Sequence, residues 1–303
     1  MSLSDGRVLI ECDQNSYELQ TMPAEDFPEP PDIEPLATIE FKQNDLRRLL
    51  NQVLFAVPAR DPRKVLLGAL FDLRENELRA VATDGKKLGL SSLVVEESRG
   101  ESKIQAIIPQ KVLSELEKNL GPEGSVTVQL GEKRVGFELG KITYVASRIE
   151  GTFPNYELVI PKQLDHEVRI NKEKFSAGIR RAAILSEARN NSIVLKFSEG
   201  RLNIGASTAD LGTFKGAIPA EFSGDEINLA FNHRYLTDVL KVIGTDDLLI
   251  RINTPSSPVI FVETGETRAL FLIMPIKITD LSDLGSGPED EEEGDSENAE
   301  SQQ

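Results

Sequence analysis

An internal repeat of about 125 residues is the feature that most constrains the fold of this chain. Leu78 and Ala82 in one copy correspond to Leu202 and Ala206 in the next, both at a spacing of 124 positions. Each copy has the same predicted order, which is a strand, a helix, a hairpin, a strand, a second helix and three closing strands. The sequence therefore predicts two copies of one α+β domain, each with two helices packed on antiparallel sheet.

Apolar residues that recur at helical spacing predict the helices. In the first copy, Asn44 is the expected N-cap of a helix that ends near Val57, and a second helix is expected to start at Pro109. The matching helices of the second copy are predicted over 172–186 and 232–243. Strands are expected at 38–41, 70–82, 103–108, 126–130, 135–139, 142–147, 168–170, 193–206, 227–231, 248–252, 259–263 and 270–274.

A third, partial copy precedes the two complete ones. Phe27-Pro28 and Phe153-Pro154 each follow a terminal strand, and they lie 126 residues apart. Residues 6–28 therefore resemble the last two strands of the same domain, followed by a proline-rich, extended linker. The predicted domains are a remnant of a first copy over 1–29, a middle domain over 30–161, a last domain over 162–278 and an acidic, disordered tail over 279–303.

The net charge of −16 is concentrated in two segments. Ten acids and no base lie within 280–303, and five more acids lie within 24–35, so the rest of the chain carries a net charge of only −1. Salt limits electrostatic repulsion to a Debye length of roughly 8–10 Å. A locally basic face that binds nucleic acid is therefore compatible with the acidic total.

Composition also bears on the class of protein. The single cysteine, Cys12, excludes an internal disulfide and a cysteine-rich metal site. No apolar run approaches the roughly 18 residues that a membrane-spanning helix requires, and the first residues lack the pattern of a signal peptide. We expect a cytoplasmic protein.

The sequence contains little that points to catalysis. The two histidines, His166 and His233, have neither triad-like nor metal-like spacing, and no phosphate-binding glycine loop is found. Asp84 beside Lys86 is a candidate acid–base pair, but a turn aspartate is the favoured interpretation. We expect no catalytic residue, no metal and no cofactor. A hydrolase is an alternative for which the sequence offers no matching site.

The stretch 70–90 combines a hairpin with a turn of unusual composition. Thr83-Asp84-Gly85 has turn chemistry, and Lys86-Lys87 leads directly into the next apolar residues. The second copy continues with Thr208-Ala209-Asp210 instead. Because the hairpin is shared while the turn differs, we predict that the turn forms one wall of a peptide-binding pocket. The segment Met274-Pro275-Ile276, which core packing explains less well, is a second candidate part of that site.

Basic residues occur on all four predicted helices. The net charges of these helices are +1, 0, +3 and +1 in chain order. Lysines and arginines that face phosphates give affinity for DNA without sequence readout. The alternative is that these are the solvated faces of ordinary amphipathic helices. The residues concerned are Arg47, Arg48, Lys111, Lys118, Arg180, Arg181, Arg234 and Lys241.

Four motifs occur in register along the chain, namely AVATDGKKL at 80–88, FPNY at 153–156, RAAILS at 181–186 and IMPI at 273–276. Together they resemble the bacterial DNA polymerase III beta subunit family, the sliding clamps, from about residue 6 to residue 278. The resemblance implies three similar domains per subunit. Two subunits would close head to tail into a homodimer ring around duplex DNA, with the helices lining the hole.

The resemblance also implies a function without catalysis. A clamp tethers the replicative polymerase, and partners insert a short, partly apolar peptide into a pocket between the second and third domains. The implied partners are double-stranded DNA, the polymerase III catalytic subunit, the clamp loader and other proteins with a clamp-binding motif. Carried over by position, the pocket residues are Leu66, Thr83, Gly85, Lys86, Lys87, Leu88, Pro154, Leu158, Val159, Asn232, Tyr235, Ser256, Leu272, Ile273, Met274, Pro275 and Ile276.

The resemblance further places Arg63 among the DNA-facing residues, and it places Ile184 and Leu185 at the interface between subunits. The family's first domain is nearly all missing from these 303 residues. We therefore expect a monomer or a weak dimer. The alternative function is a clamp-fold peptide-binding adaptor that does not encircle DNA. The acidic tail could shade the pocket or repel DNA, and the sequence leaves both roles open.

Overall fold

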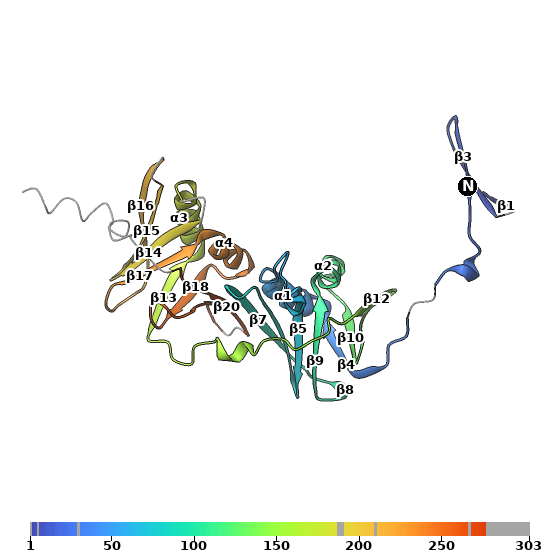
Figure 1. Cartoon of the computed structure of the whole chain (residues 1–303), viewed down its shortest axis with the longest axis horizontal. Coiled ribbons are helices and arrows are strands. Elements are labelled where there is room, and N and C mark those ends of the chain that lie inside the picture. Colours follow the sequence, from blue (N-terminus) through green and yellow to red (C-terminus); the bar gives the residue numbers. More distant parts are fainter. Residues whose placement is uncertain are drawn as a thin grey trace, which may run out of the picture.

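The structure is a computed structural model that describes residues 2–4, 6–28, 31–186, 191–208, 211–265 and 268–276. Two similar domains lie side by side along an arc, and a small N-terminal sheet stands apart from them (Figure 1). The predicted acidic tail over 279–303 lies outside the described residues, as do residues 209–210.

The N-terminal sheet has the order β1 (Ser2–Ser4), β2 (Arg7–Cys12) and β3 (Asn15–Gln20), with antiparallel pairing throughout. The sequence predicted β2 and β3 but not β1. A short 3-10 helix, η1 (Ala24–Asp26), follows in the stretch that we expected to be wholly extended.

The middle domain contains a complete copy of the repeat. Its elements are β4 (Pro35–Lys42), α1 (Gln43–Leu54), η2 (Lys64–Leu66), β5 (Gly68–Arg74), β6 (Glu77–Thr83), β7 (Lys87–Val94), β8 (Ser98–Gly100), β9 (Lys103–Pro109), α2 (Gln110–Asn119), β10 (Ser125–Gly131), β11 (Arg134–Leu139) and β12 (Ile142–Ser147). The sequence did not predict β7, nor β8, which is a short edge strand beside β4.

The last domain repeats this order. Its elements are η3 (Tyr156–Leu158) in the linker, β13 (His166–Asn171), α3 (Lys172–Ile184), β14 (Ser192–Ser198), β15 (Arg201–Thr208), β16 (Gly212–Pro219), β17 (Ile227–Asn232), α4 (His233–Val242), β18 (Asp247–Ile252), β19 (Val259–Glu263) and β20 (Ala269–Ile273). The sequence missed β16. Because Thr208 pairs with Gly212, the second copy also turns where the first turns between β6 and β7.

Two predicted helix starts were wrong. Asn44 is not the N-cap of α1, because β4 runs directly into the helix and Lys42, with extended backbone, takes that position. The regular helix ends at Leu54, before the predicted end at Val57. Pro109 is the N-cap of α2 and the last residue of β9, not the first helical residue.

One sheet crosses the joint between the two domains. Its strand order is β13-β18-β19-β20-β7-β6-β5-β9, and β7 and β20 pair in antiparallel fashion at the joint. Phe271 on β20 lies opposite Gly89 on β7. A side chain at Gly89 would meet the Gln52 carbonyl oxygen at 2.8 Å, so glycine lets α1 approach the joint closely.

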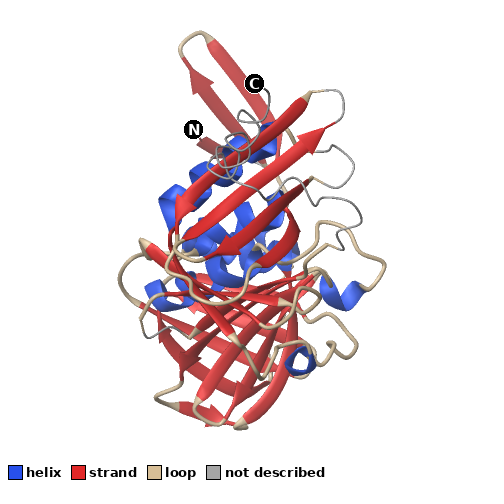
Figure 2. Ribbon diagram, turned by 90° about the vertical axis from the view of Figure 1, so that its left-hand side faces the viewer, coloured by secondary structure: helices blue, strands red, loops and turns tan. Residues whose placement is uncertain are grey.

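Helices cover one face of this sheet. The core of the middle domain includes α1 and α2 residues such as Leu46 and Leu113, and the core of the last domain includes α3 and α4 residues such as Phe175 and Leu236. The end-on view shows the helices above the long sheet (Figure 2). A third apolar cluster lies on the opposite, outer face of the joint.

Candidate functional site

The outer face of the joint gathers four of the predicted pocket residues. Leu66, Leu88 and Leu272 are buried there, and Met274 is partly buried against them. Leu88 and Leu272 are opposite each other in the β7–β20 ladder, so the two domains each contribute half of the floor. The site therefore exists only because the last strand of one domain joins the sheet of the other.

The turn between β6 and β7 is held by its own side chains. The Asp84 carboxylate accepts hydrogen bonds from the backbone N–H groups of Lys86 at 2.7 Å and Lys87 at 2.9 Å. The Thr83 hydroxyl donates to the Lys87 carbonyl at 2.7 Å, and Gly85 has a φ of +86°. Asp84 is thus a structural turn residue, as the favoured interpretation predicted.

The C-terminal segment is attached to this turn. The Met274 N–H donates to the Lys86 carbonyl at 2.8 Å, and the Ile276 N–H donates to the Ala230 carbonyl of β17 at 2.7 Å. Pro275 lies between these two residues. Because proline has no backbone N–H, this position leaves no hydrogen-bond donor unpaired. The segment therefore has a fixed backbone, and the Met274 side chain is partly buried against the apolar cluster of Leu66, Leu88 and Leu272.

Three predicted pocket residues lie on the other, helix side of the sheet, namely Lys87, Ile273 and Tyr235, which packs from α4 against the core of the last domain. Lys87 is buried, and its ammonium group lies 2.8 Å from an Asp238 carboxylate oxygen of α4 and over the rings of Phe55 and Tyr235. Ile273 is fully buried in the core of the last domain. The side chains of Lys87 and Ile273 close the joint from the helix side, and their backbones form the ladder next to the pocket.

The remaining predicted pocket residues lie in the linker, at the start of α4 and in the turn before β19. Leu158 and Val159 are exposed on and just after η3, with 81% and 47% of their surface accessible, and Pro154 is exposed in the same linker. Asn232 caps α4 by accepting a hydrogen bond from the Arg234 N–H. Ser256 is exposed in the turn before β19, where its hydroxyl lies 3.4 Å from that of Thr254.

Arg63 lies beside the turn rather than on a helix. Its guanidinium makes two hydrogen bonds to the Asp61 carboxylate, at 2.9 Å each, and a third to the Asp84 carbonyl at 3.3 Å. The hydrogen bonds from Arg63 to Asp61 lower the pKa of the Asp61 carboxyl group to about 2. The sequence placed Arg63 with the DNA-facing residues, whereas its contacts support the pocket turn.

A polar network that the sequence did not reveal, built around the buried Tyr156–Asp72 bond, holds the linker in place. The Tyr156 hydroxyl donates to the Asp72 carboxylate at 2.9 Å, and Arg74 pairs with the same oxygen at 2.7 Å. Glu157 pairs with Arg74 at 2.6 Å and with Arg79 at 3.2 Å. The signal available in the sequence was Asp72 itself, a charged residue in an apolar strand. The network fixes the segment that carries Pro154, Leu158 and Val159.

We expect this network to make the protein sensitive to alkaline pH. Burial raises the pKa of Tyr156 from 10.0 to about 12. Stability that depends on the neutral phenol is therefore complete below about pH 10 and declines as the pH rises towards 12. In Tyr156→Phe, the decline of Tm between about pH 9.5 and 11.5 should be shallower than in the wild type. Equal slopes would contradict this role.

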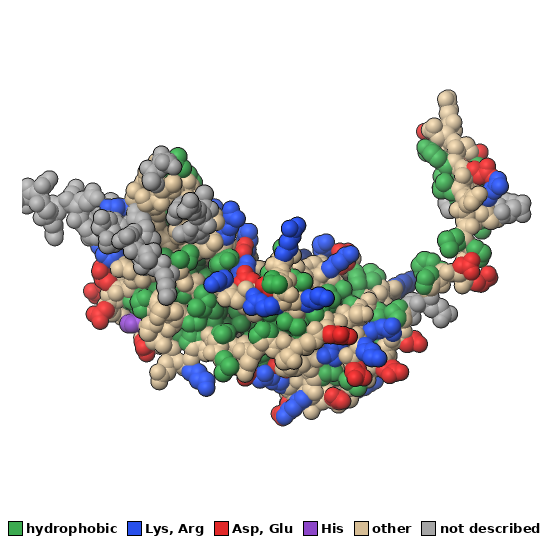
Figure 3. Space-filling view, in the orientation of Figure 1, with side chains coloured by type: hydrophobic (Ala, Val, Ile, Leu, Met, Phe, Trp, Pro, Cys, Tyr) green, Lys and Arg blue, Asp and Glu red, His purple; other side chains and the backbone are tan. Residues whose placement is uncertain are grey.

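Exposed cations lie over the helices of both domains. Figure 3 shows Lys and Arg side chains on the side where the helices lie, and others, mixed with Asp and Glu, along the opposite edge. Arg48 is exposed on α1 but also lines a groove on the outer side of the joint. The other helix cations that were predicted are all exposed, namely Arg47, Lys111, Lys118, Arg180, Arg181, Arg234 and Lys241.

The two residues predicted at the interface between subunits lie at the end of α3. Ile184 is 74% exposed, and Leu185 is partly buried against the last domain's core.

The described residues contain no cluster of three or more His, Cys, Asp or Glu side chains that could hold a metal ion. Within the same residues, no helix is long and apolar enough to cross a membrane.

Comparison with known proteins covers both domains. Residues 40–155 match the profile described as "DNA polymerase III beta subunit, central domain", and residues 157–277 match the one described as "DNA polymerase III beta subunit, C-terminal domain". The beta sliding clamp of Pseudomonas putida is 30% identical over 279 residues, which cover 92% of this chain and 76% of the relative. The beta sliding clamp of Escherichia coli K12 is 28% identical over the same shares.

Solved structures give the same result. The DNA polymerase III subunit beta of Pseudomonas aeruginosa superposes with a TM-score of 0.85 at 29% identity, over 91% of this chain and 76% of that one. A structure of the Pseudomonas aeruginosa sliding clamp bound to griselimycin superposes with a TM-score of 0.86 at 29% identity, over 91% of this chain and 75% of that one.

Proposed function

Because the chain belongs to the DNA polymerase III beta subunit family, we propose that it is a sliding clamp that encircles duplex DNA and holds the replicative polymerase on it. A sliding clamp is a non-catalytic processivity factor, so the protein acts by binding. The observation that carries the proposal is the continuous sheet across the joint, which places the helices of both domains, with their exposed cations, on one side of the arc.

The pocket on the outer face of the joint is the proposed site for partner proteins. Its floor of Leu66, Leu88 and Leu272 suits a leucine or phenylalanine side chain, and Met274 supplies an adaptable wall. The turn at Thr83 and the cap residue Asn232 offer polar groups at its edge. The proposed occupants are peptides of the polymerase III catalytic subunit, the clamp loader and other clamp-binding proteins.

The joint between the two domains suggests how a ring would close. Phe271 is the third residue of β20, and the third residues of β12 and β3 are Tyr144 and Tyr17, at equal intervals of 127 residues. Strand β3 is therefore the counterpart of β20. Strand β16 is the counterpart of β7, and no described strand pairs with its outer edge. We propose that β3 of one copy pairs with β16 of a second copy.

The residue that follows the helix beside the β7–β20 joint also has a counterpart beside the proposed β3–β16 contact. Phe55 and Ile184 each lie 13 residues after the N-cap of α1 and α3, respectively. Phe55 contacts Phe271 across the joint, with ring centroids 5.8 Å apart. The exposed Ile184 would meet Tyr17 of the second copy in the same way. The structure thus offers more for self-association than the sequence led us to expect.

Ring closure can be tested with Ile184→Asp. We expect the wild type to form a dimer in sedimentation velocity, and we expect the variant to dissociate at least tenfold more readily, because a carboxylate would replace an apolar contact. With a clamp loader, the wild type should remain on nicked circular DNA and leave when the circle is cut. Leu158→Asp, at an equally exposed apolar residue, is the control and should dimerise normally. A monomeric wild type that still binds peptide would favour the adaptor function.

A further inference from the structure

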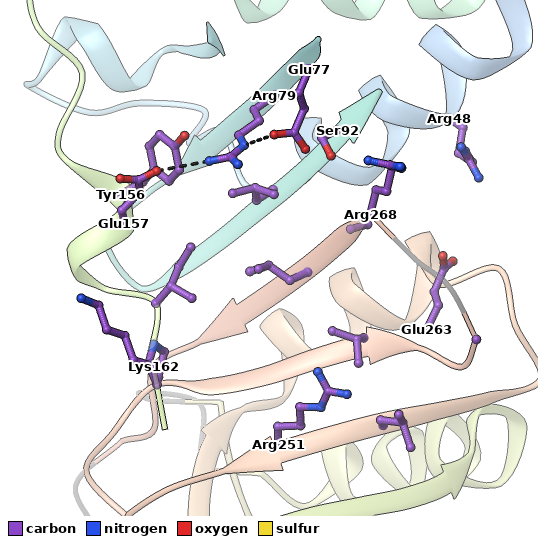
Figure 4. A pocket seen from close by; sticks show the side chains of 18 residues that line it. Arg48, Glu77, Arg79, Ser92, Tyr156, Glu157, Lys162, Arg251, Glu263 and Arg268 are labelled. Atoms are coloured by element: carbon purple, nitrogen blue, oxygen red, sulfur yellow. Dashed lines mark hydrogen bonds and ion pairs between the residues drawn. The ribbon is translucent and has the colours of Figure 1, made fainter. Parts of the chain in front are cut away.

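A groove on the outer face of the joint is separate from the predicted peptide pocket. It has a volume of about 1030 Å³, and strands of both domains form its floor (Figure 4). Leu90 and Leu270 are opposite each other in the β7–β20 ladder, and Val262 of β19 extends the same apolar floor. The linker with Tyr156 and Lys162 forms one side.

The charged residues that line this groove are five cations and three glutamates, Glu77, Glu157 and Glu263. Arg79 is paired with Glu77 and Glu157, and Arg251 with Glu167. By contrast, the side chains of three other lining residues make no hydrogen bond or ion pair with any residue that the structure describes. These are Arg48, Lys162 and Arg268, and all three are exposed. Arg268 also interacts electrostatically with Glu77. The groove therefore combines an apolar floor with an excess of positive charge, which suits a ligand that is apolar and acidic.

The chain contains a segment with this chemistry. The 27 residues that follow Ile276 include Asp280-Leu281-Ser282-Asp283-Leu284 and then the acidic run 289–293. Strand β20, which leads from the groove to Met274, has five residues and is therefore about 17 Å long. Leu281 and Leu284 lie five and eight residues after Ile276, so a fully extended chain reaches roughly 17 Å to the first and 27 Å to the second, which is enough to turn back along the length of β20.

We propose that the groove binds this chain's own acidic tail, with Leu281 and Leu284 on the apolar floor and the acidic run beside Arg268 and Lys162. The other two surfaces fit the tail less well. The helix cations occur without an apolar floor, and at the pocket turn Arg63 is already bonded to Asp61, which leaves Lys86 as the exposed cation beside that pocket. This inference does not depend on the proposed function.

Zero-length carbodiimide coupling of the full chain tests the proposal directly, because it joins carboxylates only to lysines that they contact. We expect tail acids to couple mainly to Lys162, as mapped by mass spectrometry of the monomer band. Coupling mainly to Lys86 would place the tail at the pocket, and coupling mainly to Lys111, Lys118 or Lys241 would place it on the helices. Each of these results, or no coupling at all, would overturn the proposal.

Variants make the same test quantitative. Arg48→Glu with Arg268→Glu should reduce coupling to Lys162 at least fivefold, because both reversals place negative charge beside the acidic run. The matched control is Arg180→Glu with Arg181→Glu, which makes the same change of charge on α3 and should leave the coupling unchanged. Leu281→Ser with Leu284→Ser should also reduce it, if the leucines contact the floor. Equal losses in the groove and control variants would show that net charge alone drives the coupling, against the proposal.

Discussion

Replacing Met274 and Pro275 together by alanine is expected to weaken the binding of a partner peptide by about 2–4 kcal/mol, which is roughly 30-fold to 1000-fold in Kd. Met274 is the partly buried wall of the pocket, and Pro275 restricts the backbone between two fixed hydrogen bonds. The change removes side-chain contact area and pre-organisation together, and both contribute to affinity.

The fold should survive this change. The backbone bonds from Met274 to Lys86 and from Ile276 to Ala230 do not involve the side chains that are removed. A fluorescence titration with a labelled peptide that carries leucine and phenylalanine anchors measures the effect. Val94→Ala, at an exposed apolar residue at the far end of β7, is the control and should bind normally. Unchanged affinity in the double variant would remove Met274 and Pro275 from the site.

Reversing one cation in each domain is expected to have the second large effect. Arg47→Glu with Arg181→Glu should weaken binding to duplex DNA by about 10- to 100-fold at low salt. It should also lower the slope of log K against log salt concentration by roughly 2, since each lost phosphate contact contributes about 0.9. Both residues are exposed, Arg47 on α1 and Arg181 on α3, and make no ion pair within the described residues.

A control of equal charge separates this effect from simple repulsion. Arg99→Glu with Lys103→Glu makes the same change of net charge on β8 and at the start of β9. We expect this control to bind DNA almost as well as the wild type at physiological salt, because the Debye length is about 8 Å. Peptide affinity should be unchanged in both variants. If both pairs weakened DNA binding equally, the helix cations would be ordinary solvated surface.

The parts of this protein that the sequence predicted depend on local interactions. The helix faces followed from apolar spacing, and α3 and α4 lie within one or two residues of their predicted ranges. The turn at Asp84 followed from the ability of a short carboxylate to bond the next backbone N–H groups. The repeat itself was visible because both copies satisfy the same local requirements.

Tertiary structure decided which side chains share a surface. Lys87 and Ile273 belong to the pocket motifs, but the alternation of side chains along β7 and β20 places them on the helix side. Tyr156 and Asp72 are 84 residues apart in sequence, and only the packing of the linker on the sheet brings them into contact. The groove likewise forms where strands of two domains meet. Local sequence sets the type and the ends of each element, whereas the face and partners of a residue depend on contacts between distant segments.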